Sequence, residues 1–418
     1  MMNLAAVTDN RLEQRAMAGV MDGVRVLEVA AWVFVPAAGA VLADLGADVI
    51  KVEDPRTGDP YRGLVTQGIA TVHEGVNYSV EQANRGKRII GLDLKSDEGR
   101  ALLYRLAATS DVFLTSFRPA SLVRLRLDVA DLRQHNPSIV YVRGHGSGFR
   151  GPQANRPGYD ATAFWARGAM AHTLTPPDAE RPITQRPAFG DRTGAMNLAF
   201  GIAAALFRRE RTGEPSVVDV SLLSSAAWVL ATDVLNATVP GAASGTERPR
   251  PRNPLVNAFE TSDGRWLSLV FLQPDRYWVE LCEHLGRPEL AGDPRFVDGE
   301  ARASHTEECR AALAEAFAGR PYREWCERLN GLDAPWAPMQ SVRELLDDEQ
   351  FRANGYLQEV DTGDGATFPL VGAPVQFDGA PAPLRRAPEP GEHTEAVLRE
   401  LGIGWDEIAA FKQRGVIT

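Results

Sequence analysis

Short apolar runs rich in β-branched residues alternate with helix-forming segments in the first half of the chain. The runs are VRVLEVA, ADVIKVE, RIIGLDL, DVFLTSF and SIVYVRG, at 24–30, 47–53, 88–94, 111–117 and 138–144. Helix signals lie between them, such as Pro36 at a helix start and Ser96 as an N-cap before two acidic residues. Strands alternating with helices of this length predict β-α-β units and a mostly parallel sheet covered on both faces.

A longer apolar segment follows, and after it the residue composition of the chain changes. Residues 194–209, GAMNLAFGIAAALFRR, are apolar nearly all round, which predicts a buried helix. VVDVSLL at 217–223 predicts one more strand, followed by another helix. From residue 240 a stretch of Gly, Pro and Arg is typical of a linker or loop, so we expect a domain boundary just before it.

The chain beyond this stretch predicts a smaller α+β domain. AFETSDGRWLSLVF, at 258–271, alternates around Asp263-Gly264 and predicts a β-hairpin. Helical segments are predicted at 274–285, 300–318 and 321–330. Strand signals return after residue 355, and a last helix is predicted near the C-terminus.

Composition and charge limit the possible functions. With 418 residues, of which 44% are hydrophobic and 24% charged, the chain is long enough for two globular domains. The formal charge of −10 argues against a nucleic-acid partner, so an anionic ligand would need a local basic pocket. The first 21 residues lack the apolar core of a signal peptide and are interpreted as an arm, and Asp219 and Asp233 interrupt the most apolar later segment. Three isolated cysteines suit a reducing compartment, so we expect a cytoplasmic protein without a membrane partner.

Basic residues recur close to the predicted strands, where open α/β sheets bind their ligands. They are Arg56, Arg62, Lys87, Arg88, Arg118, Arg124 and Arg143. Each alone is typical of a solvated surface, whereas several converging at one sheet edge would form an anion pocket for a multi-phosphate ligand. His145, in RGHGSG, is either a turn residue or a ligand contact.

Several other chemistries lack their motifs. The first β-α turn has no G-x-G-x-x-G, which disfavours a nicotinamide oxidoreductase. No H-E-x-x-H motif is present, so we expect no metal. No G-x-S-x-G elbow or cysteine signature supports serine or cysteine catalysis.

Asp191 lies between two glycines in PAFGDRTGAM, just before the predicted 194–209 helix. It could be the N-cap of that helix, accepting a hydrogen bond from a free backbone N–H. Alternatively it could be a nucleophile kept ionised by the helix dipole, with Gly190 and Gly194 leaving room for a ligand against the backbone. The local sequence leaves both interpretations open.

The ordered blocks VRVLEVA…LADLGADVIKVE, NRGKRIIGLDLKSDEGR, GYDATAFWARGAM, AFGDRTGAM, LVGAPVQF and GEHTEAVLRELG resemble the class III coenzyme A transferases. This family includes formyl-CoA and carnitine CoA-transferases and the related α-methylacyl-CoA racemases, and the resemblance covers about residues 22–415. It implies a Rossmann-like large domain from both chain ends, 1–225 and 341–418, and a small domain with linkers, 226–340. It also implies an interlocked homodimer.

The resemblance further implies a mechanism and a set of CoA contacts. Asp191, in the G-D-x-x-G block, would attack an acyl-CoA to form an anhydride and then an aspartyl-CoA thioester, with acyl-CoA and a carboxylic acid as substrates and no tightly bound cofactor. Backbone N–H groups near the glycines are candidates for oxyanion stabilisation. The implied CoA contacts are Trp32, Val33, Arg56, Lys87, Arg88, Phe117, Arg124, Arg143, Gly144 and His145.

Two departures from the family pattern bear on the activity. Family racemases carry a histidine where this chain has Tyr159, which favours a transferase over the alternative of an acyl-CoA racemase or epimerase. The glycine-rich loop of formyl-CoA transferases has no counterpart, which argues against an oxalate and formate substrate pair. A CoA-binding protein without turnover is the other alternative.

Overall fold

The computed structural model describes residues 19–240 and 251–418. The chain divides into two compact units, one of Met1–Thr246 with Ala353–Thr418 and one of Glu247–Arg352. These limits lie further along the chain than the predicted 225/226 and 340/341, because Leu222 and Ala226 are buried in the core of the larger unit. Most of the predicted arm and most of the predicted linker lie outside the described residues.

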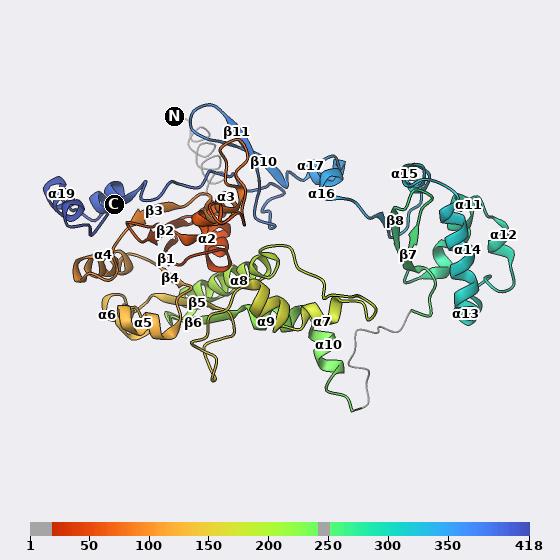
Figure 1. The fold of residues 1–418 in the computed structure, drawn as a ribbon, viewed down its shortest axis with the longest axis horizontal. Helices are drawn as coiled ribbons and strands as arrows, with labels where there is room; N and C mark the ends of the chain where they lie inside the picture. The colour runs from red at the N-terminus through yellow and green to blue at the C-terminus, as the bar shows by residue number, and fades with distance from the viewer. Residues whose placement is uncertain (1–18, 241–250) are drawn as a thin grey trace, which may run out of the picture. The chain divides into compact units, whose positions relative to one another are not determined.

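A six-stranded sheet organises the larger unit. Its strands are β1 (Arg25–Val29), β2 (Asp48–Glu53), β3 (Arg88–Gly91), β4 (Val112–Thr115), β5 (Val140–His145) and β6 (Val217–Ser221). Their order is β3-β2-β1-β4-β5-β6, and every neighbouring pair is parallel. The predicted parallel sheet is confirmed, and the carboxyl ends of all six strands meet at one edge (Figure 1).

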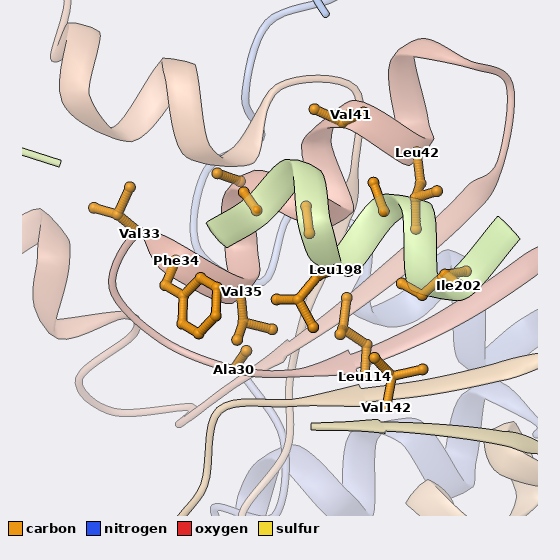
Figure 2. Close-up of a cluster of buried hydrophobic side chains, with 14 of the residues drawn as sticks. Ala30, Val33, Phe34, Val35, Val41, Leu42, Leu114, Val142, Leu198 and Ile202 are labelled. Atoms are coloured by element: carbon orange, nitrogen blue, oxygen red, sulfur yellow. The ribbon is translucent and has the colours of Figure 1, made fainter. Parts of the chain in front are cut away.

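Helices α2 (Phe34–Asp44) and α8 (Phe189–Thr212) cover one face of this sheet. The two helices cross closely, and their apolar side chains interdigitate above strands β4 and β5 (Figure 2). The residues in contact include Phe34, Val35, Leu114, Val142, Leu198 and Ile202. Gly144 and Gly194 allow this approach, because a Cβ on Gly194 would lie 2.5 Å from the Phe34 ring.

The opposite face is covered by helices from both ends of the chain. They are α4 (Asp97–Ala108), α5 (Pro119–Leu125), α6 (Val129–His135), α18 (Thr394–Glu400) and α19 (Trp405–Gln413). Leu103, Leu132, Val397 and Leu398 are fully buried there against strand residues such as Phe113. The larger unit is therefore built from both chain ends.

Shorter elements complete the larger unit. They are η1 (Pro60–Leu64), α3 (Tyr78–Asn84), η2 (Asp160–Ala166), α7 (Met170–Leu174), α9 (Leu222–Val229), α10 (Ala231–Asn236), β10 (Leu357–Asp361) and β11 (Thr367–Val371). Strands β10 and β11 form an antiparallel pair, and α3 contacts β11.

The smaller unit has an antiparallel sheet of β7 (Val256–Glu260), β8 (Trp266–Val270) and β9 (Trp336–Pro338). The predicted hairpin is present, with Gly264 at φ 73° in its turn. The helices are α11 (Pro274–Leu285), α12 (Glu289–Gly292), α13 (Gly299–Ser304), α14 (Thr306–Ala318), α15 (Tyr322–Leu329), α16 (Val342–Leu345) and α17 (Glu349–Ala353). Trp278 and Trp325 are the largest aromatic side chains of its core.

Helix α8 differs from the helix predicted at 194–209 in two ways. It begins at Phe189, so Asp191 lies inside its first turn, and the cap residue Ala188 makes no side-chain hydrogen bond. The helix is also not buried all round, since Phe200 and Phe207 are 76% and 68% exposed. The prediction of a wholly buried helix was wrong because α2, the sheet, α9 and η2 cover only part of its circumference.

Candidate active site

A cavity of about 170 Å³ opens at the carboxyl end of the sheet, where the loops after β1, β4 and β5 converge. Its wall includes Trp32 after β1, Ser116 after β4, His145 at the end of β5, Tyr159 and Asp191. Parallel strands bring these segments together although more than 150 residues separate the first from the last. The strand-end position predicted for the site therefore corresponds to a real cavity.

Asp191 is the carboxylate that faces this cavity. Burial and the neighbouring carboxylate of Asp160 raise its pKa to about 7, although the positive charge of Arg192 opposes the shift. The N-cap interpretation was wrong, because Asp191 is in the first helical turn and caps no backbone N–H. The side chain is left accessible to the cavity, and it ionises near neutral pH.

Asp160 begins η2 and holds the start of α8 in place. Its two carboxylate oxygens accept the backbone N–H of Gly190 at 3.1 and 3.2 Å. Burial raises the pKa of Asp160, so two desolvated carboxyl groups interact here. A Cβ on Gly190 would lie 2.2 Å from the Phe164 ring and 2.5 Å from Asp160 Oδ1, which makes glycine necessary at this position.

The glycines beside Asp191 therefore serve packing. Gly190 contacts Phe164 and Asp160, and Gly194 contacts the Phe34 ring. The space expected there for a ligand is filled by these side chains. The Gly190 N–H is likewise already paired with Asp160, so it is not a free donor for an oxyanion.

Trp32 has an unusual backbone at the cavity wall. Its φ of 70° lies in the left-handed region, which is costly for a tryptophan. The conformation is held by its backbone N–H, which donates to Asp59 Oδ1 at 3.1 Å. Its ring contacts the Tyr159 ring edge-on with centroids 5.5 Å apart, so the two aromatic side chains form one side of the cavity.

A fully buried charge cluster lies behind Trp32. Lys51 Nζ is 2.5 Å from Asp59 Oδ2, 3.6 Å from Glu53 and 4.0 Å from Glu28. Lys87 Nζ is 2.8 Å from Glu28, and burial lowers the pKa of Lys87 to about 8. The cluster anchors Asp59, and through it the backbone of Trp32.

His145 is 4% exposed and lines the same cavity. Its Nδ1 accepts the backbone N–H groups of Ser147 and Gly148, both at 3.0 Å. Burial and the nearby charge of Arg118 lower the pKa of His145. The imidazole is therefore neutral at pH 7 and fixes the turn after β5, with its ring against Phe149.

A larger cavity of about 680 Å³ adjoins the first and is rich in cations. The two share Ala31, Trp32, Ser116 and Arg118 in their walls. The further lining residues are Lys95, Arg100, Phe117, Ser121, Arg124 and Leu125. Four basic side chains around one cavity in an acidic protein predict an anionic ligand with several charges.

Comparisons with known proteins match this arrangement to a family. The sequence model of CoA-transferase family III matches residues 21–394. The chain belongs to this family. It is 30% identical to the (R)-2-hydroxy-4-methylpentanoate CoA-transferase of Clostridioides difficile, over 95% of this chain and 99% of that protein. It is 32% identical to the cinnamoyl-CoA:phenyllactate CoA-transferase of Clostridium sporogenes, over 94% of this chain and 96% of that protein.

Solved structures give the same result for the fold of this CoA-transferase. A CAIB/BAIF family protein from Brucella suis superimposes with a TM-score of 0.78 at 31% identity, covering 92% of this chain and all of that one. Rv3272 from Mycobacterium tuberculosis superimposes with a TM-score of 0.77 at 30% identity, covering 91% of this chain and 99% of that one. The resemblance to class III CoA-transferases and the mixed α/β fold are thereby confirmed.

The structure brings together six of the residues that the sequence assigned to the site of this CoA-transferase. They are Trp32, Phe117, Arg124, Gly144, His145 and Asp191, which line the two adjoining cavities. Arg56 is exposed after β2 and pairs with Asp54 and Asp93. Val33 lines a different cavity.

Three other predicted contacts are already paired within the fold. Lys87 is buried against Glu28, and Arg143 makes a two-bond ion pair with Asp219. Arg88 begins β3 and pairs with Asp48 at the start of β2, at the amino end of the strands and away from both cavities. We leave these three residues out of the proposed CoA site.

Lys95, Arg100 and Asp160 were missed. The first two follow β3 toward the carboxyl end of the sheet, whereas Lys87 precedes that strand and Arg88 is its first residue. Applying the strand-end rule to the residues after RIIGLDL would have found Lys95. Asp160 stands in the noted GYD block, but its contact with Gly190 joins residues 30 apart and has no sequence signal.

Neither a group of metal ligands nor a membrane-spanning helix is found among the described residues. Within 19–240 and 251–418, no three His, Cys, Asp or Glu side chains are grouped to hold a metal ion. Across the same ranges, no helix combines the length and apolar character needed to cross a bilayer.

Proposed function

We propose that this enzyme moves CoA from an acyl-CoA to a free carboxylic acid, with Asp191 as the nucleophile. The observation that carries the proposal is the position of Asp191. This carboxylate faces a small cavity that shares a wall with a larger basic one. A CoA thioester has the matching shape, since its phosphates fit a cation-lined cavity and its thioester extends toward the carboxylate.

The proposed reaction uses the carboxylate twice. Asp191 attacks the thioester carbonyl, the C–S bond breaks, and CoA leaves as a thiolate while an acyl-aspartyl anhydride remains. The thiolate then attacks the aspartyl carbonyl of the anhydride, which releases the first acid and leaves an aspartyl-CoA thioester. A second acid repeats these steps in reverse and departs as the new acyl-CoA. None of these steps requires a proton transfer, because the thiolate and the carboxylate both leave as anions.

The residues around Asp191 support these steps by position. Lys95, Arg118 and Arg124 bind the CoA phosphates, and Phe117 lies beside them in the same cavity. Arg100 belongs to the same wall but is paired with Asp97. Trp32 and Tyr159 enclose the thioester from one side. Asp160 fixes the start of α8 through the Gly190 N–H and so sets the position of the nucleophile.

We further propose a homodimer without a tightly bound cofactor, located in the cytoplasm. The acyl transfer needs no redox or metal chemistry, since both intermediates are activated acyl groups. The compartment is supported by three free thiols at Cys282, Cys309 and Cys326. The dimer is supported by exposed apolar side chains on α8 and α9, including Phe200 and Trp228.

A trapping experiment tests the nucleophile. Wild-type enzyme incubated with an acyl-CoA and hydroxylamine should acquire a hydroxamate on Asp191, located by peptide mass spectrometry. Asp191→Ala should lose CoA exchange by about 10³-fold or more, while Asp178→Asn, on an exposed loop, should retain it. Full exchange by the Asp191→Ala enzyme would overturn the assignment, and α-deuterium incorporation from D₂O without an acceptor acid would instead indicate a racemase.

A further inference from the structure

One wall of the small Asp191 cavity has a further cavity, of about 470 Å³, on its other side. The two cavities share Arg156, Pro157 and Gly158, which lie in the segment 146–158 between β5 and η2. Residues with open space on each side have few atoms to pack against. The position of this wall therefore depends on hydrogen bonds more than on packing.

The segment 146–158 is a compact loop whose ends meet. A Cβ on Gly146 would lie 2.9 Å from Gly158 Cα, so the absence of side chains lets the two backbones touch. Gly148 and Gly151 have φ angles of 100° and 85°, in the left-handed region that favours glycine. Compact surface loops with this closed shape frequently carry function.

His145, directly before the loop, hydrogen-bonds to both of its halves. The imidazole Nδ1 accepts the backbone N–H groups of Ser147 and Gly148, both at 3.0 Å. The backbone of Ala154 hydrogen-bonds to the same ring. One buried side chain thus ties the beginning of the loop to the residues just before the shared wall.

Asn155 ties the same part of the loop to α5. Its side-chain oxygen accepts the Ala120 N–H at 2.9 Å, and its backbone carbonyl accepts Arg118 Nη1 at 3.1 Å. From the direction of η2, Arg167 Nη1 donates to Ser147 Oγ at 3.3 Å. Asn155 itself lines neither of the two cavities that its loop separates.

We propose that His145 is a positioning residue of the transferase, which holds the loop 146–158 where Pro157 and Gly158 form a wall for the acyl group. The inference rests on the proposed attack of Asp191 on an acyl-CoA. Asp191 and this wall line the same cavity, so an acyl chain at the nucleophile extends against the wall. A dry cavity of about 150 Å³ accommodates benzene, so about 170 Å³ has room for an acyl group of about six carbons.

The labelling rate of Asp191 tests this role with two acyl-CoA probes. Enzyme is mixed with hydroxylamine and either hexanoyl-CoA or acetyl-CoA, and mass spectrometry gives the second-order rate constant of hydroxamate formation on Asp191. In the wild type the constant for hexanoyl-CoA should exceed that for acetyl-CoA by about 10-fold or more, because only the longer chain reaches the wall. The ratio of the two constants is the readout, since partial unfolding of a variant lowers both constants equally.

Three variants of the loop tethers should separate positioning from direct contact. His145→Ala removes the acceptor and should bring the ratio below about 3. His145→Asn keeps an acceptor near the position of Nδ1 for the Ser147 and Gly148 N–H groups, so it should recover most of the wild-type ratio. Asn155→Ala loosens the same loop from outside the cavity and should also lower the ratio, which keeps the test valid if His145→Ala does not fold.

The matched control is His135→Ala, at an exposed histidine of α6 that lines neither cavity, and it should change neither constant. A wild-type ratio in both His145→Ala and Asn155→Ala would overturn the positioning role. So would equal labelling of the wild type by the two probes, or a ratio lowered in both His145 variants but not in Asn155→Ala, which would indicate direct contact of the imidazole with the acyl group. Absence of any label on wild-type Asp191 would overturn the transferase proposal itself.

Discussion

The carboxylate of Asp191 combines two properties that oppose each other in a folded protein. It is desolvated and lies near a second carboxyl group, which disfavours its charged form, yet the proposed nucleophile is that charged form. Arg192 offsets part of this cost. A carboxylate held in this way is more nucleophilic than a solvated one, and its ionisation falls in the range where enzyme rates are measured.

The pH dependence of the first half-reaction follows from this position. With a pKa of about 7, Asp191 is mostly protonated below pH 6, so kcat/KM for acyl-CoA should fall about tenfold per pH unit there. In Asp160→Asn the amide oxygen can still accept the Gly190 N–H, but the neighbouring negative charge is absent. The acidic limb of the pH profile should then move to lower pH. If the acidic limb of the profile stays at the same pH in Asp160→Asn, Asp160 does not influence the pKa of Asp191.

The same pKa predicts a stability effect with a definite sign. The Asp191 pKa is about 7 in the folded chain and near its ordinary value of 3.8 when unfolded, so ionisation destabilises the fold increasingly as pH rises between these values. Asp191→Asn removes this cost. It should melt at higher temperature than wild type at pH 8, by about 2 °C or more, and the difference should disappear near pH 4 in thermal melts. A difference that does not change with pH would contradict the assigned pKa.

At the scale of elements, the hydrophobic pattern predicted most of the fold because each strand and helix is encoded locally. The same pattern located the cavity, since parallel strands end at one edge. It could not identify the partner of each charge. Lys87 is neutralised by Glu28, 59 residues earlier, and that pairing depends on the order β3-β2-β1 in the sheet, which no local pattern contains.

The first turn of α8 is a second feature that the sequence pattern could not predict. Glycine is a weak helix former, so the sequence places the helix start at Gly194, after PAFGDRT. In the structure Gly190 is inside the helix because Phe164 and Asp160 pack against it, which is a tertiary contact. This contact changes Asp191 from a cap into a helical residue that faces the cavity.

The buried cluster behind Trp32 gives a prediction for strand β2. Lys51→Met leaves Glu28, Glu53 and Asp59 without their shared cation, which should cost about 3–5 kcal/mol of unfolding free energy. Urea unfolding monitored by tryptophan fluorescence measures the change. Arg56→Met, at an exposed pair after the same strand, is the control and should leave the transition unmoved. If Lys51→Met unfolds at the same urea concentration as the wild type, the buried cluster does not stabilise the fold around β2.

At the scale of the whole molecule, the apolar surface of α8 and α9 predicts self-association. Phe200, Phe207 and Trp228 are 76%, 68% and 76% exposed, and a chain of 45.5 kDa that dimerises should show about twice that mass in light scattering. Phe200→Asp combined with Trp228→Glu should reduce the mass to that of one chain. Trp405→Glu, at an exposed tryptophan of α19, is the control and should remain dimeric.

The interlocked arrangement implied by the family resemblance makes a stricter prediction than dimerisation. Two chains that pass through each other can separate only if one of them unfolds, so subunit exchange should be limited by the unfolding rate, which is slow for stable domains. Differently tagged dimers, mixed without denaturant, should form no mixed dimer over days by native mass spectrometry. Brief exposure to urea above the unfolding midpoint followed by refolding should produce mixed dimers. Rapid exchange under native conditions would show that the chains associate through faces alone.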